Sequence, residues 1–130
     1  MAKAVLKRSK KTKRNIPEGI VHVFAHFNNT HITVSDLEGK VLSWATGGSS
    51  GFKGAREATP YAAQITSENA CNKAKTLHGL QKATVYIKGI GAGREQAIRG
   101  ISNAGIEIVS IYDVTPVPHN GCRKQKVRKQ

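Results

Sequence analysis

Acidic residues, aromatic residues, cysteines and long apolar runs are all scarce in this 130-residue sequence. No stretch approaches the roughly 18 apolar residues of a membrane span, and no apolar signal core follows the basic start, so we expect a cytoplasmic protein. The two cysteines lie in unlike settings, which predicts neither a disulfide in a reducing compartment nor a zinc finger. With 38% apolar and 5% aromatic residues, the length fits one domain with a modest core.

Acids are absent from both ends of the chain. Residues 1–14 hold seven cations and residues 123–130 hold five, in both cases without an acid. The middle of the chain, residues 15–122, holds nine Lys and Arg against eight Asp and Glu. The sequence therefore predicts three parts, which are a basic N-terminal arm (1–15), a single nearly neutral domain (16–115) and a basic C-terminal tail (116–130).

The two basic runs indicate a polyanionic partner. Runs of like charge repel themselves in water, and nucleic acid, an anionic membrane or an acidic protein neutralises them. A membrane-binding run favours an amphipathic helix, but the N-terminal arm offers only Val5 and Leu6 as large apolar residues. Nucleic acid is the favoured partner and no membrane contact is expected. A solvated solubility tail is the alternative.

Alternating apolar patterns predict the strands. They are expected at 19–27, 31–36, 40–46, 83–89 and 106–114. The first three are joined by short turns rich in Asn and Gly, which favour hairpins. Since strand–helix–strand crossovers are right-handed and parallel, the order β-β-β-α-β-α-β predicts an α/β fold with a mixed five-stranded sheet.

Two helices complete the predicted fold. The first should begin with Thr59 as N-cap and Pro60 in its first turn, and should end at Gly79. The second and shorter helix should follow the glycine turn after residue 89 and stop at Gly105. The buried side of the first helix is expected to consist of Ala63, Ala70, Ala74 and Leu77.

Two glycine-rich segments are candidate phosphate seats. In KGIGAGREQAIRG (88–100), Arg94 stands where a dinucleotide-binding motif has its third glycine, which disfavours a nucleotide enzyme. Free N–H groups at a helix start attract phosphate, so Gly91, Gly93 and Arg94 suit a nucleic-acid backbone. The loop 47–58 similarly carries Lys53 and Arg56 among its glycines. A tight turn and a plain flexible loop, both without a ligand, are the alternatives.

No catalytic site is predicted. Asp36, Glu57 and Asp113 are the only plausible carboxylates for a two-metal nuclease, and nothing in the predicted fold brings them together. Cys122 and His119 share a turn without a pocket or an orienting acid. We therefore expect no enzyme activity, no metal and no cofactor.

RNA is favoured over DNA. Neither predicted helix presents a row of Arg, Asn or Gln for the DNA major groove. The sequence has no heptad pattern, so we expect no homo-oligomer. Long irregular arms around a small domain suit a folded RNA with crevices and packed phosphates. A nucleoid-associated DNA-binding protein is the main rival.

Four blocks of the sequence resemble the bacterial small-subunit ribosomal protein S-eleven family. They are HFNNTHITVSD (26–36), GGSSGFKGAREATPYAAQ (47–64), KGIGAGREQAIRGI (88–101) and DVTPVPHNGCR (113–123). The last block is the most specific, although Lys124 and Gln125 follow Arg123 where the family commonly has proline. The resemblance implies a ribonuclease-H-like topology, no catalytic activity, and a structural role in small-subunit assembly and translation.

The resemblance also implies partners. They are small-subunit ribosomal RNA of the central domain and the 3′ end, and neighbouring ribosomal proteins of the platform. The messenger RNA exit site and the Shine–Dalgarno helix should lie nearby.

The residues and the resemblance together predict the RNA-binding side chains. Pro116 and Pro118 should stiffen the exit from the last strand and aim the tail. Asn120 precedes a glycine that does not shield the attacking amide, and the resemblance implies that Asn120 becomes an isoaspartate in the mature particle. The predicted RNA-binding residues are Lys7, Arg8, Lys10, Lys11, Lys13, Arg14, Asn28, Asn29, Thr30, His31, Lys53, Arg56, Gly91, Gly93, Arg94, His119, Asn120, Gly121, Arg123, Lys124, Lys126, Arg128 and Lys129.

Overall fold

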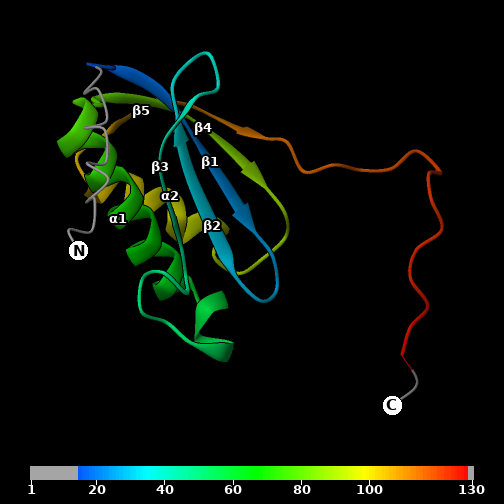
Figure 1. Ribbon diagram of the computed structural model, residues 1–130. Coiled ribbons are helices and arrows are strands. Elements are labelled where there is room, and N and C mark those ends of the chain that lie inside the picture. The colour runs from blue at the N-terminus through cyan, green and yellow to red at the C-terminus, as the bar shows by residue number, and fades with distance from the viewer. Residues whose placement is uncertain (1–14, 129–130) are drawn as a thin grey trace, which may run out of the picture.

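The computed structural model describes residues 15–128, in which one mixed sheet is covered by two helices (Figure 1). Its elements are β1 (Glu18–Ala25), β2 (Thr30–Ser35), β3 (Val41–Thr46), a short 3-10 turn η1 (Gly54–Ala58), α1 (Pro60–His78), β4 (Lys82–Lys88), α2 (Arg94–Asn103) and β5 (Glu107–Asp113). The predicted order is confirmed, with strand bounds within two residues of those expected. The predicted cations of residues 1–14 and Lys129 lie outside the described residues.

The strand order in the sheet is β3-β2-β1-β4-β5. β1 pairs antiparallel with β2, and β2 pairs antiparallel with β3, as in the predicted meander. β4 pairs parallel with β1, and β5 pairs parallel with β4, as expected for crossovers through α1 and α2. The predicted α/β class with a mixed five-stranded sheet is therefore confirmed.

Helix α1 begins and ends as its sequence predicts. The Thr59 hydroxyl accepts the backbone N–H of Ala62 at 3.3 Å, and Pro60 occupies the first turn. Gly79 ends the helix in the left-handed conformation at φ 66°, which glycine adopts without a Cβ clash. The prediction for Leu77 is wrong, because its side chain is 49% exposed. Leu80, just beyond the helix end, is fully buried in its place.

The core lies between one face of the sheet and both helices. Branched residues of β1, β2 and β4 meet small residues of α1 and the apolar side of α2, including Ala97 and Ile101. The helices also pack on each other, where the buried hydroxyl of Ser67 donates to the Ala97 carbonyl at 2.8 Å. Because both helices cover the same face, the opposite face of the sheet carries no helix of the described residues, and we call it the helix-free face.

Candidate nucleic-acid interface

Chain direction brings the predicted contact segments to one end of the sheet. β1, β4 and β5 run parallel and finish there, and β3, antiparallel to β2, finishes there as well. The β1–β2 connection, the glycine loop after β3, the glycine turn after β4 and the tail after β5 therefore all start at this end. We call it the tip end. The sequence analysis did not predict that these segments lie at one end, because they are far apart along the chain. Their common location follows from the strand order.

Asn29 ties two of these segments together. Its side-chain oxygen accepts the backbone N–H of Thr30 at 2.8 Å and that of Gly47 at 3.1 Å. The β1–β2 connection and the glycine loop are thus joined by one amide group. Asn28 beside it is exposed, and His31 is partly exposed on the helix-free face. These side chains are available at the surface.

Thr30 is placed differently from the prediction. Its side chain is 1% exposed and points into the fold, so it is not available to an outside ligand. Among the described residues, its hydroxyl is a buried side-chain group without a hydrogen-bond partner. Thr30 therefore supports the tip from inside and leaves the set of direct contacts.

Both predicted cations of the glycine loop line the same hollow. A cavity of about 360 Å³ is lined by Gly51, Phe52, Lys53 and Arg56. Gly51 adopts a φ of 94°, which allows a backbone path that a residue with a Cβ rarely takes. Two cations around a concave surface form an arrangement suited to phosphate.

The glycines of the turn before α2 serve close packing. The backbone N–H of Gly91 donates to the Ala25 carbonyl at 3.0 Å, and a Cβ on Gly91 would lie 2.5 Å from the carbonyl oxygen of His26. A Cβ on Gly93 would lie 2.6 Å from the Cβ of Ala63. Both glycines are buried, so the turn matches the alternative of a tight strand–helix connection. They position the start of α2 without touching the surface.

Arg94 is held by partners from its own chain. Its guanidinium donates to the Gly89 carbonyl at 2.9 Å and pairs with the Asp113 carboxylate at 2.6 Å. Asp113 also accepts hydrogen bonds from the backbone N–H of Thr115 at 3.0 Å and from the Thr115 hydroxyl at 2.6 Å. The hydrogen bonds from Thr115, followed by that from Arg94, lower the pKa of Asp113 to about 2. The Arg94 side chain is 30% exposed, so part of its charge still faces solvent.

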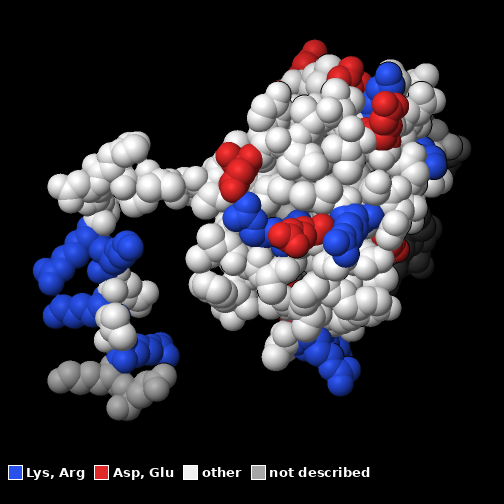
Figure 2. All heavy atoms as spheres, turned by 180° about the vertical axis from the view of Figure 1, so that it is seen from behind, with Lys and Arg blue, Asp and Glu red and all other residues white. Residues whose placement is uncertain are grey.

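The tail projects from the tip end as an exposed, irregular segment. Figure 2 shows its Lys and Arg side chains grouped together without an acid, whereas the visible face of the domain mixes both signs. His119, Gly121 and the described tail cations are exposed, and Asn120 adopts a φ of 62°. Residues 117–124 bend around a cavity of about 540 Å³. The described tail cations are Arg123, Lys124, Lys126 and Arg128.

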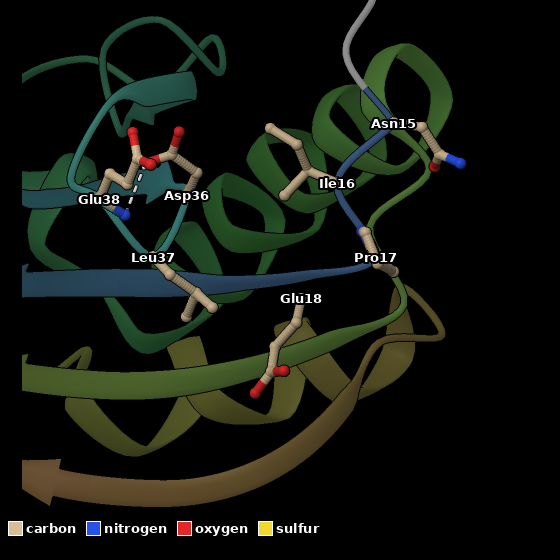
Figure 3. A pocket seen from close by; sticks show the side chains of 7 residues that line it. All are labelled: Asn15, Ile16, Pro17, Glu18, Asp36, Leu37 and Glu38. Atoms are coloured by element: carbon tan, nitrogen blue, oxygen red, sulfur yellow. Dashed lines mark hydrogen bonds between the residues drawn. The ribbon is translucent and has the colours of Figure 1, made fainter.

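The opposite end of the sheet is acidic. A hollow of about 510 Å³ lies there. It is lined by Asn15, Ile16, Pro17, Glu18, Asp36, Leu37 and Glu38 (Figure 3). Asp36 accepts the backbone N–H groups of Glu38 and Lys40 at 3.0 and 2.8 Å, which fixes the β2–β3 turn. Carboxylates repel phosphate, so this hollow suits a nucleic acid less well than the cationic hollow at the tip end does.

The groups considered for catalysis are not assembled. Asp36 lies at the acidic end, whereas Glu57 and Asp113 lie toward the tip end. Within residues 15–128, no three His, Cys, Asp or Glu side chains form a group that could hold a metal ion. In the same part of the chain, no helix is long and apolar enough to cross a membrane.

Sequence reasoning missed one surface. The helix-free face of the sheet carries exposed rings, among them Phe24, Trp44 and Tyr112. The signal was the alternation of VHVFAH, in which His22 and Phe24 share one face of β1. Sequence alone does not give the register that places rings from different strands side by side.

Comparison with known proteins identifies the family. The family described as "Ribosomal protein S11" matches residues 19–129. "Small ribosomal subunit protein uS11c" of Oltmannsiellopsis viridis is 54% identical over 129 residues, covering 99% of each chain. "Small ribosomal subunit protein uS11" is 55% identical in Borreliella burgdorferi, over 98% of each chain, and 53% identical in Aromatoleum aromaticum, over 99% of each chain. The chain therefore belongs to the ribosomal protein S11 family.

Proposed function

We propose that this chain binds small-subunit ribosomal RNA through its tip end and basic tail, as a structural part of the ribosome. Membership of the S11 family makes it a ribosomal protein of the cytoplasm and not an enzyme. The finer proposal concerns where it binds. It places the chain on the platform, on RNA of the central domain and the 3′ end. The messenger RNA exit site, the Shine–Dalgarno helix and neighbouring ribosomal proteins lie nearby in this proposal.

One observation carries the proposal. Three features lie at the tip end of the sheet, namely the start of the cationic tail, the β1–β2 connection and the cationic hollow of the glycine loop. The carboxylate-rich hollow lies at the other end. Among residues 15–128, this polarity favours a polyanion at the tip end. The proposed direct contacts among the described residues are Asn28, Asn29, His31, Lys53, Arg56, Arg94, His119, Asn120, Gly121, Arg123, Lys124, Lys126 and Arg128.

The roles of these residues differ. The tail cations supply phosphate affinity that does not depend on base sequence. The side chains of the β1–β2 connection and the glycine loop fix the orientation of the domain on the RNA. The N-terminal cations, which lie outside the described residues, are proposed to act like the tail.

A salt titration with a matched control tests this assignment. Binding of the full chain to deproteinised small-subunit ribosomal RNA is measured over a range of KCl concentrations. The plot of log K against log salt has a negative slope, and each lost phosphate contact reduces its magnitude by about 0.7 to 0.9. The pair Arg123→Gln and Lys124→Gln should therefore reduce the magnitude by about 1.5. The control pair Lys40→Gln and Lys82→Gln, away from the tip end, should leave the slope unchanged. Equal effects of both pairs would contradict the proposed orientation.

A second measurement tests assembly. Small subunits are washed at high salt and sedimented, and the fraction of this chain that stays bound is determined. The chain should stay with the small subunit, and the tail variant should be released at lower salt than the control. Release of the wild-type chain to the top of the gradient would favour a loose polyanion-binding coat.

A further inference from the structure

The helix-free face of the sheet carries two neighbouring rows of side chains. Strand register aligns the first row across all five strands, and we call it the ring row: Tyr112, Tyr86, His22, Thr33 and Trp44. The second row is one step nearer the tip end and consists of Lys88, Phe24, His31 and Thr46. Both helices pack on the other face, so neither row is covered by a helix of residues 15–128 (Figure 1).

The rings of the first row stand side by side. The Tyr86 and Tyr112 rings stack with centroids 5.4 Å apart and planes 23° apart. His22 continues the stack on Tyr86 at 5.8 Å and 18°. Tyr112 lies on the edge strand β5 and is 51% exposed, and Trp44 lies on the other edge strand β3 and is 59% exposed. The row therefore offers ring surface to solvent at both edges of the sheet.

The charges around the rows suit a nucleic acid. Neither row contains a carboxylate, and the Lys88 ammonium lies 5.8 Å from the centroid of the Phe24 ring. The carboxylates of β1 and β5 on this face, Glu18 and Glu107, flank Lys82 at the acidic end. Proteins that bind single-stranded RNA combine aromatic rings, on which the bases stack, with cations that contact the phosphates.

The ring row is also continuous with the tail. Asp113 follows Tyr112 and ends β5, and the tail continues from there. The tail that carries Arg123 and Lys124 therefore begins beside Tyr112, at the open edge of the row.

We propose that the ring row is a stacking platform for unpaired bases of RNA, with Tyr112 as its entry point. This inference rests on the proposed function, because it adds a base-binding surface to the phosphate-binding tail and tip. The rings bind base faces while the cations bind phosphates. The two contributions therefore respond differently to salt.

Substitution of Tyr112 tests the platform through that difference. Stacking releases no counterions, so Tyr112→Leu should weaken binding to deproteinised small-subunit ribosomal RNA about 10-fold at every salt concentration, with an unchanged salt slope. Tyr112→Phe keeps the ring and should bind like the wild type. Leu37→Ala is the control, since Leu37 is a 61% exposed apolar residue that lies at the opposite, acidic end of the sheet.

Trp44 provides a readout that does not depend on ribosomal RNA. It is the single tryptophan of the chain, so its fluorescence reports on the ring row. Short oligoadenylate should quench this fluorescence at low salt, and the quenching should weaken in Tyr112→Leu but not in Leu37→Ala. Thermal unfolding of each variant confirms that the exposed substitutions leave the fold intact.

The outcomes separate the two proposals. Wild-type affinity of Tyr112→Leu without a change in quenching would overturn the platform and leave the proposed function standing. Equal losses in Tyr112→Leu and Tyr112→Phe would overturn it too, by assigning the contact to the hydroxyl. Normal RNA affinity of Tyr112→Leu with weaker retention in washed subunits would assign the face to a neighbouring protein instead. Quenching by oligoadenylate without any ribosomal RNA affinity would overturn the proposed function and support the platform.

Discussion

Arg94 and Asp113 form an ion pair, with 2.6 Å between Nη2 and Oδ2, that joins the first residue of α2 to the last residue of β5. The same carboxylate accepts two hydrogen bonds from Thr115, the second residue after β5 and the last before the tail. The direction in which the tail leaves the sheet is therefore set by contacts around one exposed carboxylate. Arg94, which is also a proposed phosphate contact, thus helps to orient the tail.

The titration of Asp113 should report on this arrangement. In the folded protein its pKa is lowered to about 2, first by the hydrogen bonds from Thr115 and then by Arg94. Since the pKa of Asp in an unfolded chain is about 3.9, the stabilisation is present above that pH and is lost as the pH falls through about 2. Carboxyl NMR titration should show the Asp113 midpoint rising in Thr115→Val and in Arg94→Gln. An unchanged midpoint in both variants would contradict the proposed orientation of the tail.

Gly100 should resist substitution although it lies inside a helix. Replacing glycine by alanine in a helix normally stabilises it by about 0.5–1 kcal/mol. Here a Cβ would collide with the Ser67 hydroxyl and lie 2.5 Å from the Gln64 carbonyl, where α1 and α2 meet. We expect Gly100→Ala to lower the free energy of unfolding by about 1–3 kcal/mol. Thermal or urea unfolding measures this change.

Ser102→Ala in the same helix is the matched control, because Ser102 is exposed. It should leave stability unchanged or raise it by about 0.5 kcal/mol. If Gly100→Ala were as stable as this control, the close packing of the two helices would be contradicted.

Local chemistry explains why the fold was predictable. Thr59, Pro60 and Gly79 act within one or two turns of the chain, so their roles do not depend on distant partners. The error at Leu77 has a tertiary cause. The chain turns at Gly79 toward β4, and this brings Leu80 instead of Leu77 against the core.

The interface was only partly predictable because it depends on register and burial. The sequence marked the cationic segments, and the tail cations do lie on the surface. It did not show that the Thr30 side chain turns inward, nor that Gly91 and Gly93 are needed by the packing of their neighbours. It also missed the ring row, whose members come from strands far apart in the chain.

The two cysteines should differ sharply in reactivity. Cys71 is fully buried in α1, and burial raises the pKa of its thiol to about 12, so almost no thiolate forms at neutral pH. Cys122 is exposed in the tail. Titration of the RNA-free protein with a chromogenic disulfide should modify Cys122 at once and Cys71 only after denaturation. Cys122→Ser should abolish the fast phase, and equal rates for both thiols would contradict the burial of Cys71.

Asn120 should convert to isoaspartate in two steps. The Gly121 backbone nitrogen attacks the Asn120 side-chain carbonyl carbon and ammonia leaves, and water then opens the resulting succinimide. The site is exposed, and glycine at the following position leaves the attacking nitrogen unshielded. Peptide mass spectra of purified ribosomes, combined with isoaspartyl-specific methylation, should detect the product at residue 120. Gly121→Ala should slow the reaction because its methyl group shields the amide, whereas Gly39→Ala, in the β2–β3 turn, should not. Unmodified Asn120 in ribosomes from aged cells would contradict the prediction, and unequal conversion between free protein and ribosomes would show that RNA binding controls access to the tail.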